Sequence, residues 1–275
     1  MTYRPRRSAL FMPASNARAI EKARSLPCDV VILDLEDAVA PEMKEDARAA
    51  AVMAVKAGGF GSRELVVRVN GLDTKWGADD LAALRDVSVD AVLLPKVSGP
   101  EPLAEARSML DAPLWAMIET CQAMLNLRGI VGAGPAALVA GTNDLAKDMR
   151  CRPGEDRAPL VPLLAQIVVA ARSVGAAALD GVSNAIDDPE AVGIECRQGL
   201  ELGFDGKTLI HPSQVQPANR VFTPTAEEVA WAEKVAAAFA LPEHQGRGAI
   251  GVEGRMVELL HLEDARRTLA LAAAG

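Results

Sequence analysis

The chain has 275 residues, of which 50% are hydrophobic, 24% are charged and only 3% are aromatic. A chain of this length buries a core without disulfides or structural metals, and α/β barrels of about 250 residues often form a single domain. The formal net charge is −8 at pH 7, and this acidic balance disfavours a nucleic-acid partner. With so few aromatic residues, the core must consist mainly of Ala, Val, Leu and Ile.

Apolar segments are too short for a membrane protein. The longest candidate, 161–179, is interrupted by polar residues, and the run 9–13 is too short for the core of a signal peptide. The four cysteines lie far apart and lack zinc-binding spacing. We therefore expect a cytoplasmic protein with reduced thiols and no membrane partner.

Short β-rich runs alternate with longer helical patterns along the whole chain. Several of the runs are continuously apolar, as in parallel strands that are covered on both faces. The predicted strands are 9–12, 30–35, 65–69, 91–94, 114–118, 137–140, 177–179 and 208–210.

Capping signals place the helices between these strands. Asn16 caps a predicted helix at 16–25, and Pro41 opens one at 42–56. A third covers 101–110, and the fourth runs from 188 to 202, where Gly203 stops it.

Eight strand–helix units predict a (β/α)8 TIM barrel over residues 1–223. A doubly wound open sheet is the alternative, but it usually has a glycine-rich turn after its first strand, and residues 13–16 do not form one. Residues 224–275 are expected to form a C-terminal helical extension, with a helix at 226–240, a glycine-rich loop at 246–254 and a last helix to 274. This extension would act as a lid or a subunit contact.

Charged residues gather where the predicted strands end, and in a barrel these ends meet at one mouth. Carboxylates follow several strands and would repel one another without a cation among them. Arg68 and Lys96 supply part of the positive charge that would offset this repulsion. A divalent metal ion would supply the rest. The strand-end residues are Asp34, Glu36, Asp37, Arg68, Asn70, Lys96, Glu119, Asp144, Asp180 and His211.

Glu119 and Asp144 are the predicted Mg²⁺ ligands, because Mg²⁺ takes one or two protein carboxylates and completes its shell with water and substrate oxygens. The alternative is that each merely caps the following helix.

Three further basic residues have two interpretations each. Arg18 and Lys22 share a helix face and would either be solvated charges or bind phosphate. His211 suits either a ligand contact or a structural hydrogen bond. No P-loop, Gly-x-Ser-x-Gly motif or obvious Ser/His/Asp order is present, so hydride transfer and NTP hydrolysis find no support.

Seven motifs occur in a fixed order along the chain. They are RSALFMP (7–13), VILDLEDAV (31–39), VRVN (67–70), LPK (94–96), IET (118–120), GTNDL (141–145) and KTLIHP (207–212). Together they resemble the citrate lyase beta subunit-like family of the HpcH/HpaI aldolase superfamily, which includes stand-alone malyl-CoA and citramalyl-CoA lyases. The resemblance spans nearly the whole chain.

This resemblance implies a homo-oligomeric TIM barrel, a trimer or hexamer, with Mg²⁺ on Glu119 and Asp144. It also implies that Arg68 holds the substrate and an enolate-like oxygen. The matched CoA-phosphate residues are Arg18 and Lys22, and those lining the thioester site are Phe11, Ile210 and His211.

Two departures from the family pattern stand out. The usual Pro-Gly of the first motif is Pro13-Ala14, and the C-terminal Asp that is thought to transfer a proton across a subunit interface is replaced by Glu258.

The predicted activity is Mg²⁺-dependent carbon–carbon cleavage of a 3-hydroxyacyl-CoA thioester to acetyl-CoA and a 2-oxo acid. Arg68 would stabilise the enolate, Glu258 would protonate it, and Glu36 and Asp37 would order Arg68 and water. The alternatives are a citrate lyase beta subunit acting on a carrier-bound thioester, a malyl-CoA thioesterase, a lyase of free 4-hydroxy-2-oxo acids, and a catalytically silent ligand-binding homologue.

Overall fold

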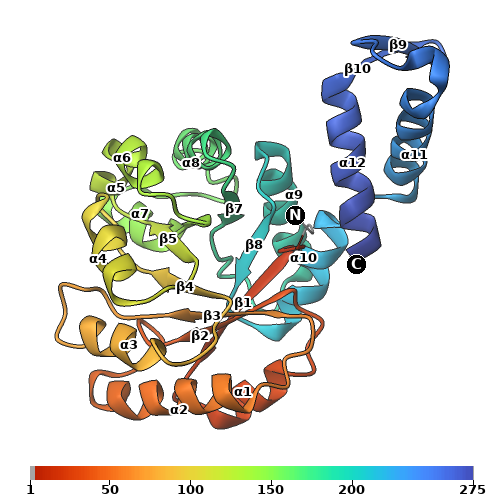
Figure 1. Ribbon diagram of the computed structural model, residues 1–275. Coiled ribbons are helices and arrows are strands. Elements are labelled where there is room, and N and C mark those ends of the chain that lie inside the picture. The colour runs from red at the N-terminus through yellow and green to blue at the C-terminus, as the bar shows by residue number, and fades with distance from the viewer. Residues whose placement is uncertain (1–3, 275) are drawn as a thin grey trace. The chain divides into compact units, whose positions relative to one another are not determined.

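Eight parallel strands close into a barrel in the computed structural model, which describes residues 4–274 (Figure 1). Neighbouring strands pair in chain order, and β1 pairs with both β2 and β8. This closure confirms the TIM barrel and excludes the open doubly wound sheet. The strands are β1 (Ser8–Pro13), β2 (Val30–Asp34), β3 (Glu64–Arg68), β4 (Ala91–Leu94), β5 (Leu114–Ile118), β6 (Ala137–Ala140), β7 (Ala177–Asp180) and β8 (Gly206–Leu209).

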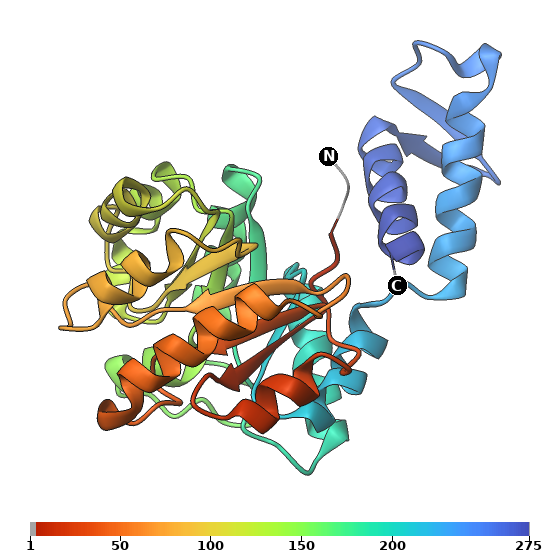
Figure 2. The ribbon, with the colours of Figure 1, turned by 60° about the horizontal axis from the view of Figure 1, so that its bottom comes forward.

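Helices surround the barrel, and Figure 2 shows α1 and α2 on its outside. The helices of residues 4–214 are α1 (Ala17–Ala23), η1 (Pro41–Met43), α2 (Lys44–Ala57), α3 (Gly77–Leu84), α4 (Glu101–Met109), α5 (Cys121–Leu125), α6 (Leu127–Gly132), α7 (Thr142–Met149), α8 (Val161–Ser173), α9 (Pro189–Leu202) and η2 (Pro212–Gln214). Those of the remaining chain are α10 (Val215–Phe222), α11 (Ala226–Ala240), η3 (Pro242–His244) and α12 (Leu259–Ala274).

The capping residues act as their sequence positions predict. The Asn16 side chain accepts from Ala19 N at the start of α1, and Asp188 accepts from two backbone N–H groups at the start of α9. Gly203 ends α9 with φ +96°, a conformation that glycine adopts without strain. The predicted helix 42–56 begins instead as the 3₁₀ turn η1 and continues as α2.

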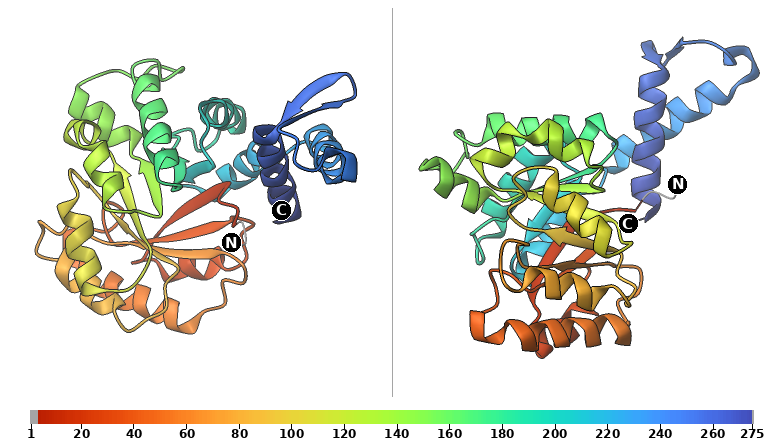
Figure 3. Two further views of the ribbon diagram at one scale, coloured as in Figure 1. Left: turned by 45° about the horizontal axis from the view of Figure 1, so that its top comes forward. Right: turned by 60° about the vertical axis from the view of Figure 1, so that its left-hand side comes forward.

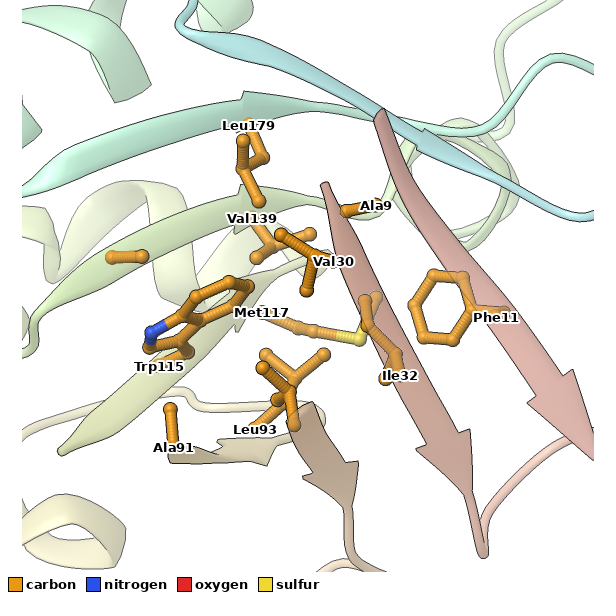
Figure 4. Packing of buried hydrophobic residues seen from close by; sticks show 12 residues of the cluster. Ala9, Phe11, Val30, Ile32, Ala91, Leu93, Trp115, Met117, Val139 and Leu179 are labelled. Atoms are coloured by element: carbon orange, nitrogen blue, oxygen red, sulfur yellow. The ribbon is translucent and has the colours of Figure 1, made fainter. Parts of the chain in front are cut away.

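The barrel interior is a packed core of alternate strand residues (Figure 4). Trp115 and Met117 of β5 lie there with Phe11 of β1 and Ile32 of β2. Because successive strand residues point to opposite faces, every second residue faces inward. The residues two positions further on therefore point toward the mouth formed by the strands' carboxyl ends.

Residues Arg6–Asn219 form one compact unit, and the chain from Arg220 onward belongs to a second. The expected domain boundary at 223/224 stays a prediction. In the second unit α11 and α12 run side by side (Figure 3). Within the described residues, no helix is long and apolar enough to cross a bilayer.

The predicted glycine-rich loop at 246–254 is wrong. Residues 249–258 form an antiparallel hairpin of β9 (Ala249–Val252) and β10 (Arg255–Glu258). Its two turn residues, Glu253 and Gly254, both have positive φ, as a type I′ hairpin turn requires. The hairpin buries Ile250, Val252 and Val257 against the helices of this unit. This packing stabilises the strand pair although the segment is rich in glycine, the feature from which a loop was predicted.

Candidate active site

On three strands of the barrel, the line of side chains that faces inward ends in a charged residue at the mouth. The three residues are Asp34 of β2, Arg68 of β3, and Glu119, which directly follows β5; each lies two residues beyond a core residue of the same strand. All three are buried, with exposed fractions of 1%, 7% and 1%. Charges with so little contact with water require partners or a ligand, so the barrel mouth is a candidate active site.

A cavity of about 310 Å³ opens at this mouth. It brings together Phe11, Asp37, Arg68, Glu119, Asp144 and Ile210, all predicted from the sequence. Its other lining residues are Asp34, Ala38, Met117, Ala140, Gly141, Thr142, Asn143, Val182 and Thr208. A second cavity of about 370 Å³ shares Glu119 and Asp144 with the first, so the two carboxylates lie where the cavities meet.

Arg68 is held on three sides. Its Nε and Nη2 donate to the two carboxylate oxygens of Asp34, both at 2.7 Å, and its Nη1 lies 3.0 Å from Glu36 Oε2. The Phe11 ring lies 4.6 Å from the guanidinium. Burial alone would lower the pKa of Arg68, but the hydrogen bonds and charge of Asp34 raise it above its ordinary value. The side chain therefore stays cationic.

Asp34 was expected among the strand-end charges of the mouth, but its sequence position alone gave it no role in the site. It pairs in register with Arg68 on the neighbouring strand, so the two side chains meet at the barrel mouth. The sequence did contain a signal for this pair, because both residues end adjacent predicted strands.

Three of the five N–H donors of Arg68 bind Asp34 and Glu36. The remaining two lie on its terminal nitrogens, and one of them contacts the sulfur of Met117.

Glu36 and Asp37 are neighbouring carboxylates that lie beside two cations, Arg68 and Lys96. The Lys96 ammonium binds Glu36 and lies 3.7 Å from Asp37. Burial raises the pKa of Glu36, although the charges of Arg68 and Lys96 oppose it. Burial would also raise the pKa of Asp37, but its hydrogen bond with Glu36 and the charges of Lys96 and Arg68 lower it. The lowered pKa keeps Asp37 ionised at neutral pH, and Asp37, unlike Glu36, lines the cavity.

The loop that carries Glu36 is anchored by a buried lysine. Lys44 donates from Nζ to the carbonyl oxygens of Leu35 and Glu36 at 2.8 and 2.7 Å. Lys44→Met is expected to destabilise the fold by about 1–3 kcal/mol, because it leaves a buried carbonyl without its donor. Thermal unfolding measures this effect. Lys75→Met is the matched control, since Lys75 is exposed and lies over the same Trp76 ring. Equal melting temperatures for both variants would contradict the anchoring role.

Glu119 and Asp144 fit a hard divalent cation. Glu119 accepts from the backbone N–H of Lys96 at 2.7 Å, and Asp144 lies in the first turn of α7, where the helix dipole favours an anion. A Cβ at Gly141 would collide with the Glu119 carboxylate, so the glycine keeps this space open. No three His, Cys, Asp or Glu side chains of residues 4–274 converge on one point. A cation here would thus take two protein carboxylates and complete its shell with water and substrate, as Mg²⁺ does.

The pH dependence of cation binding follows from the Glu119 carboxyl. Burial raises the pKa of Glu119 to about 7, against the opposing N–H and charge of Lys96. The protonated form does not bind a cation, so Mg²⁺ affinity is full above pH 7 and falls about tenfold per pH unit below it. Calorimetric titration between pH 5.5 and 8.5, roughly one and a half units either side of that pKa, measures this slope. Glu119→Gln should bind weakly with no step near pH 7, and a flat wild-type profile would exclude Glu119 as a ligand.

Five predicted site residues lie outside the lining of the 310 Å³ cavity. Arg18 and Lys22 are exposed on α1. His211 is exposed and caps η2, with Nδ1 2.7 Å from Ser213 Oγ. Glu258 ends β10, and its backbone N–H donates to His261. Their roles toward CoA or a neighbouring subunit stay predictions. Glu36, the remaining predicted residue, contacts Arg68 without lining the cavity.

Asp180, expected among the strand-end charges of the mouth, is not part of this cavity. Its carboxylate is fully buried and binds Arg157 Nη1 and Lys207 Nζ, each at 2.9 Å. Leu179 belongs to the barrel core, so the next residue of β7 points outward, toward the helices. Asp180 is therefore a structural ion-pair residue.

Comparisons with known proteins agree with this geometry. The family model described as HpcH/HpaI aldolase/citrate lyase matches residues 7–212. A (3S)-malyl-CoA thioesterase from Cereibacter sphaeroides is 46% identical over 273 residues, covering 98% of this chain and 95% of the relative. The citrate lyase subunit beta of Leuconostoc mesenteroides subsp. cremoris is 33% identical, covering 99% of this chain and 95% of the relative. The crystal structure of CitE from Mycobacterium tuberculosis with magnesium, acetoacetate and coenzyme A is 32% identical, covers 98% of both chains and has a TM-score of 0.80.

Proposed function

Because the chain belongs to the HpcH/HpaI aldolase/citrate lyase family, whose matched relatives include lyases, we propose that it is a Mg²⁺-dependent enzyme that cleaves a malyl-CoA-type 3-hydroxyacyl thioester. The observation that carries this proposal is the single cavity shared by Arg68, Glu119 and Asp144. A catalytically silent homologue would have no need to keep these three charges together. The solved relative with magnesium and coenzyme A supports the cofactor and the substrate class.

Glu119 and Asp144 would hold the metal and so fix the acid end of the substrate. When bound there, Mg²⁺ would polarise and orient the carboxylate and hydroxyl oxygens of that end. The backbone N–H of Lys96 aims the Glu119 carboxylate, and Gly141 leaves room beside it. Phe11 and Ile210 give the cavity an apolar wall for the acyl chain.

Arg68 is placed to stabilise the oxygen that gains negative charge. One N–H of Arg68 contacts neither Asp34, Glu36 nor Met117, and it is available to a carbonyl oxygen that becomes an oxyanion during hydrolysis, or to an enolate oxygen during carbon–carbon cleavage. Asp34 keeps the guanidinium in one orientation, so little reorganisation is needed when the charge develops. The same residue thus serves both reactions.

Hydrolysis of the thioester is the main reaction that we propose. The water oxygen adds to the thioester carbonyl carbon, the carbon–sulfur bond breaks, and the CoA thiolate takes up a proton. Ionised Asp37, in the cavity beside Arg68, is placed to accept a hydrogen bond from that water. Two observations favour this reaction, the 46% identity to the thioesterase and Glu258 in place of the usual Asp.

Carbon–carbon cleavage is the second candidate, favoured by the lyases among the relatives. A base takes the proton of the hydroxyl group, and the bond between the hydroxyl-bearing carbon and the carbon next to the thioester carbonyl breaks, giving a 2-oxo acid and the enolate of acetyl-CoA. The enolate carbon must then take up a proton from an acid. Glu258 is the proposed donor, reaching a neighbouring subunit of a homo-oligomer.

A panel of malyl-, citramalyl- and methylmalyl-CoA thioesters tests the proposal. Free thiol and 2-oxo acid are measured separately, with and without Mg²⁺. We expect Mg²⁺-dependent release of free thiol without 2-oxo acid. Release of 2-oxo acid without free thiol would establish the lyase instead, and neither product from any thioester would refute the proposed function.

Glu258→Gln separates the two reactions. We expect thioester hydrolysis to change little, and any 2-oxo acid formation to fall by about 10²-fold or more, because the enolate loses its general acid. Glu263→Gln, at an exposed position of α12, is the matched control. An equal loss of both products in Glu258→Gln alone would place Glu258 in a step that the two reactions share.

A further inference from the structure

Lys96 has an unusual backbone at the edge of the site. It follows β4 and Pro95, and its φ is +50°. Residues other than glycine rarely adopt this left-handed conformation. Such strain persists only where surrounding contacts stabilise it, and it concentrates at functional sites.

The contacts of Lys96 join two parts of the site that come from different strands. Its backbone N–H donates to Glu119 Oε1 at 2.7 Å. Its ammonium binds Glu36, whose other oxygen lies 3.0 Å from Arg68 Nη1. Glu119, Lys96, Glu36 and Arg68 thus form one continuous chain of polar contacts.

Positive φ is what allows both contacts at once. Rotation about the N–Cα bond sets the direction of the side chain relative to the amide N–H. In the left-handed conformation the N–H points to Glu119 while the side chain extends to Glu36.

We propose that Lys96 is a positioning residue that fixes the metal-binding carboxylate and the oxyanion-stabilising guanidinium relative to each other. The proposal rests on the proposed function of the same site. Without the ammonium, Glu36 loses its second cationic partner and no longer holds Arg68 in its present orientation. Without the backbone N–H, the Glu119 carboxylate would be free to rotate.

Lys96→Gly removes the ammonium but keeps the backbone contact, because glycine adopts positive φ without strain and retains the N–H. The variant therefore measures the contribution of the ammonium alone. We expect kcat to fall by about 10–100-fold, the usual loss when an outer partner of a site is removed. Affinity for Mg²⁺ alone should stay within about threefold of wild type, because the bond to Glu119 remains, and the melting temperature should not fall. Lys75→Gly, in an exposed turn, is the matched control.

Oxalate binding provides a readout that does not depend on turnover. This small dianion is titrated calorimetrically in the presence of Mg²⁺, and we expect Lys96→Gly to bind it about tenfold more weakly than wild type. A wild-type protein that cleaves no thioester would refute the proposed function, while the oxalate comparison would still test Lys96. Wild-type oxalate affinity in Lys96→Gly would overturn the positioning role. A fall in both Mg²⁺ affinity and melting temperature in Lys96→Gly would also overturn it, because that result would indicate a purely structural residue.

Discussion

Glu119→Gln is expected to lower Mg²⁺-dependent thioester cleavage by about 10³-fold or more while leaving the fold intact. The neutral amide removes one of two carboxylates that would hold the cation, and metal stabilisation of developing charge contributes several kcal/mol. The substituted side chain is nearly isosteric, so the hydrogen bond from Lys96 N has an acceptor in the amide oxygen. Initial rates over a range of Mg²⁺ concentrations measure the effect.

Glu105→Gln is the matched control, since this glutamate is exposed on α4 and lines neither cavity at the mouth. Its rate and Mg²⁺ response should equal those of wild type. Full activity of Glu119→Gln without added metal would show that the carboxylate serves only to balance nearby cations, and the proposed metal site would be wrong.

Arg68→Lys is expected to lower kcat by about 10²-fold or more, the typical cost of losing one preorganised oxyanion donor. A lysine ammonium is a point charge and cannot reproduce the two parallel bonds that Arg68 makes to Asp34. The remaining positive charge satisfies Asp34 only in part and no longer presents donors to the substrate oxygen. Rates at saturating thioester concentration measure this loss.

Arg172→Lys offers a control of the same chemistry outside the site, because Arg172 also binds an aspartate, Asp205, through two nitrogens at 2.8 and 2.9 Å. Both substitutions lose a bidentate pair, but only the one at position 68 should reduce kcat. An unchanged kcat in Arg68→Lys would show that Arg68 only neutralises the charges of Asp34 and Glu36.

The barrel could be predicted from the sequence because its determinants are local. Continuous apolar runs between helical patterns mark strands covered on both faces, and eight such units close a barrel. The predicted runs 91–94, 114–118 and 137–140 coincide with β4, β5 and β6. Caps such as Asn16 and Asp188 act within three residues of chain, so no tertiary information was needed to find them.

Much of the candidate site also follows from the sequence, for a geometric reason. Residues at the carboxyl ends of parallel strands share one mouth, so Arg68, Glu119 and Asp144 were expected together, and the family resemblance added Phe11 and Ile210. All five line one cavity. The chemistry that we assign to them stays a proposal, which the variants above test.

Tertiary structure decided what depends on strand register, side-chain facing and backbone torsion. Register pairs Asp34 with Arg68, and strand alternation turns Asp180 away from the mouth, toward Arg157 and Lys207. The positive φ of Lys96, which a residue of that type rarely adopts, is stabilised by contacts with residues more than 20 positions away in the chain. The hairpin at 249–258 is stable because its apolar side chains pack on α11 and α12. Pairing, facing and packing depend on distant segments, and local sequence patterns do not encode them.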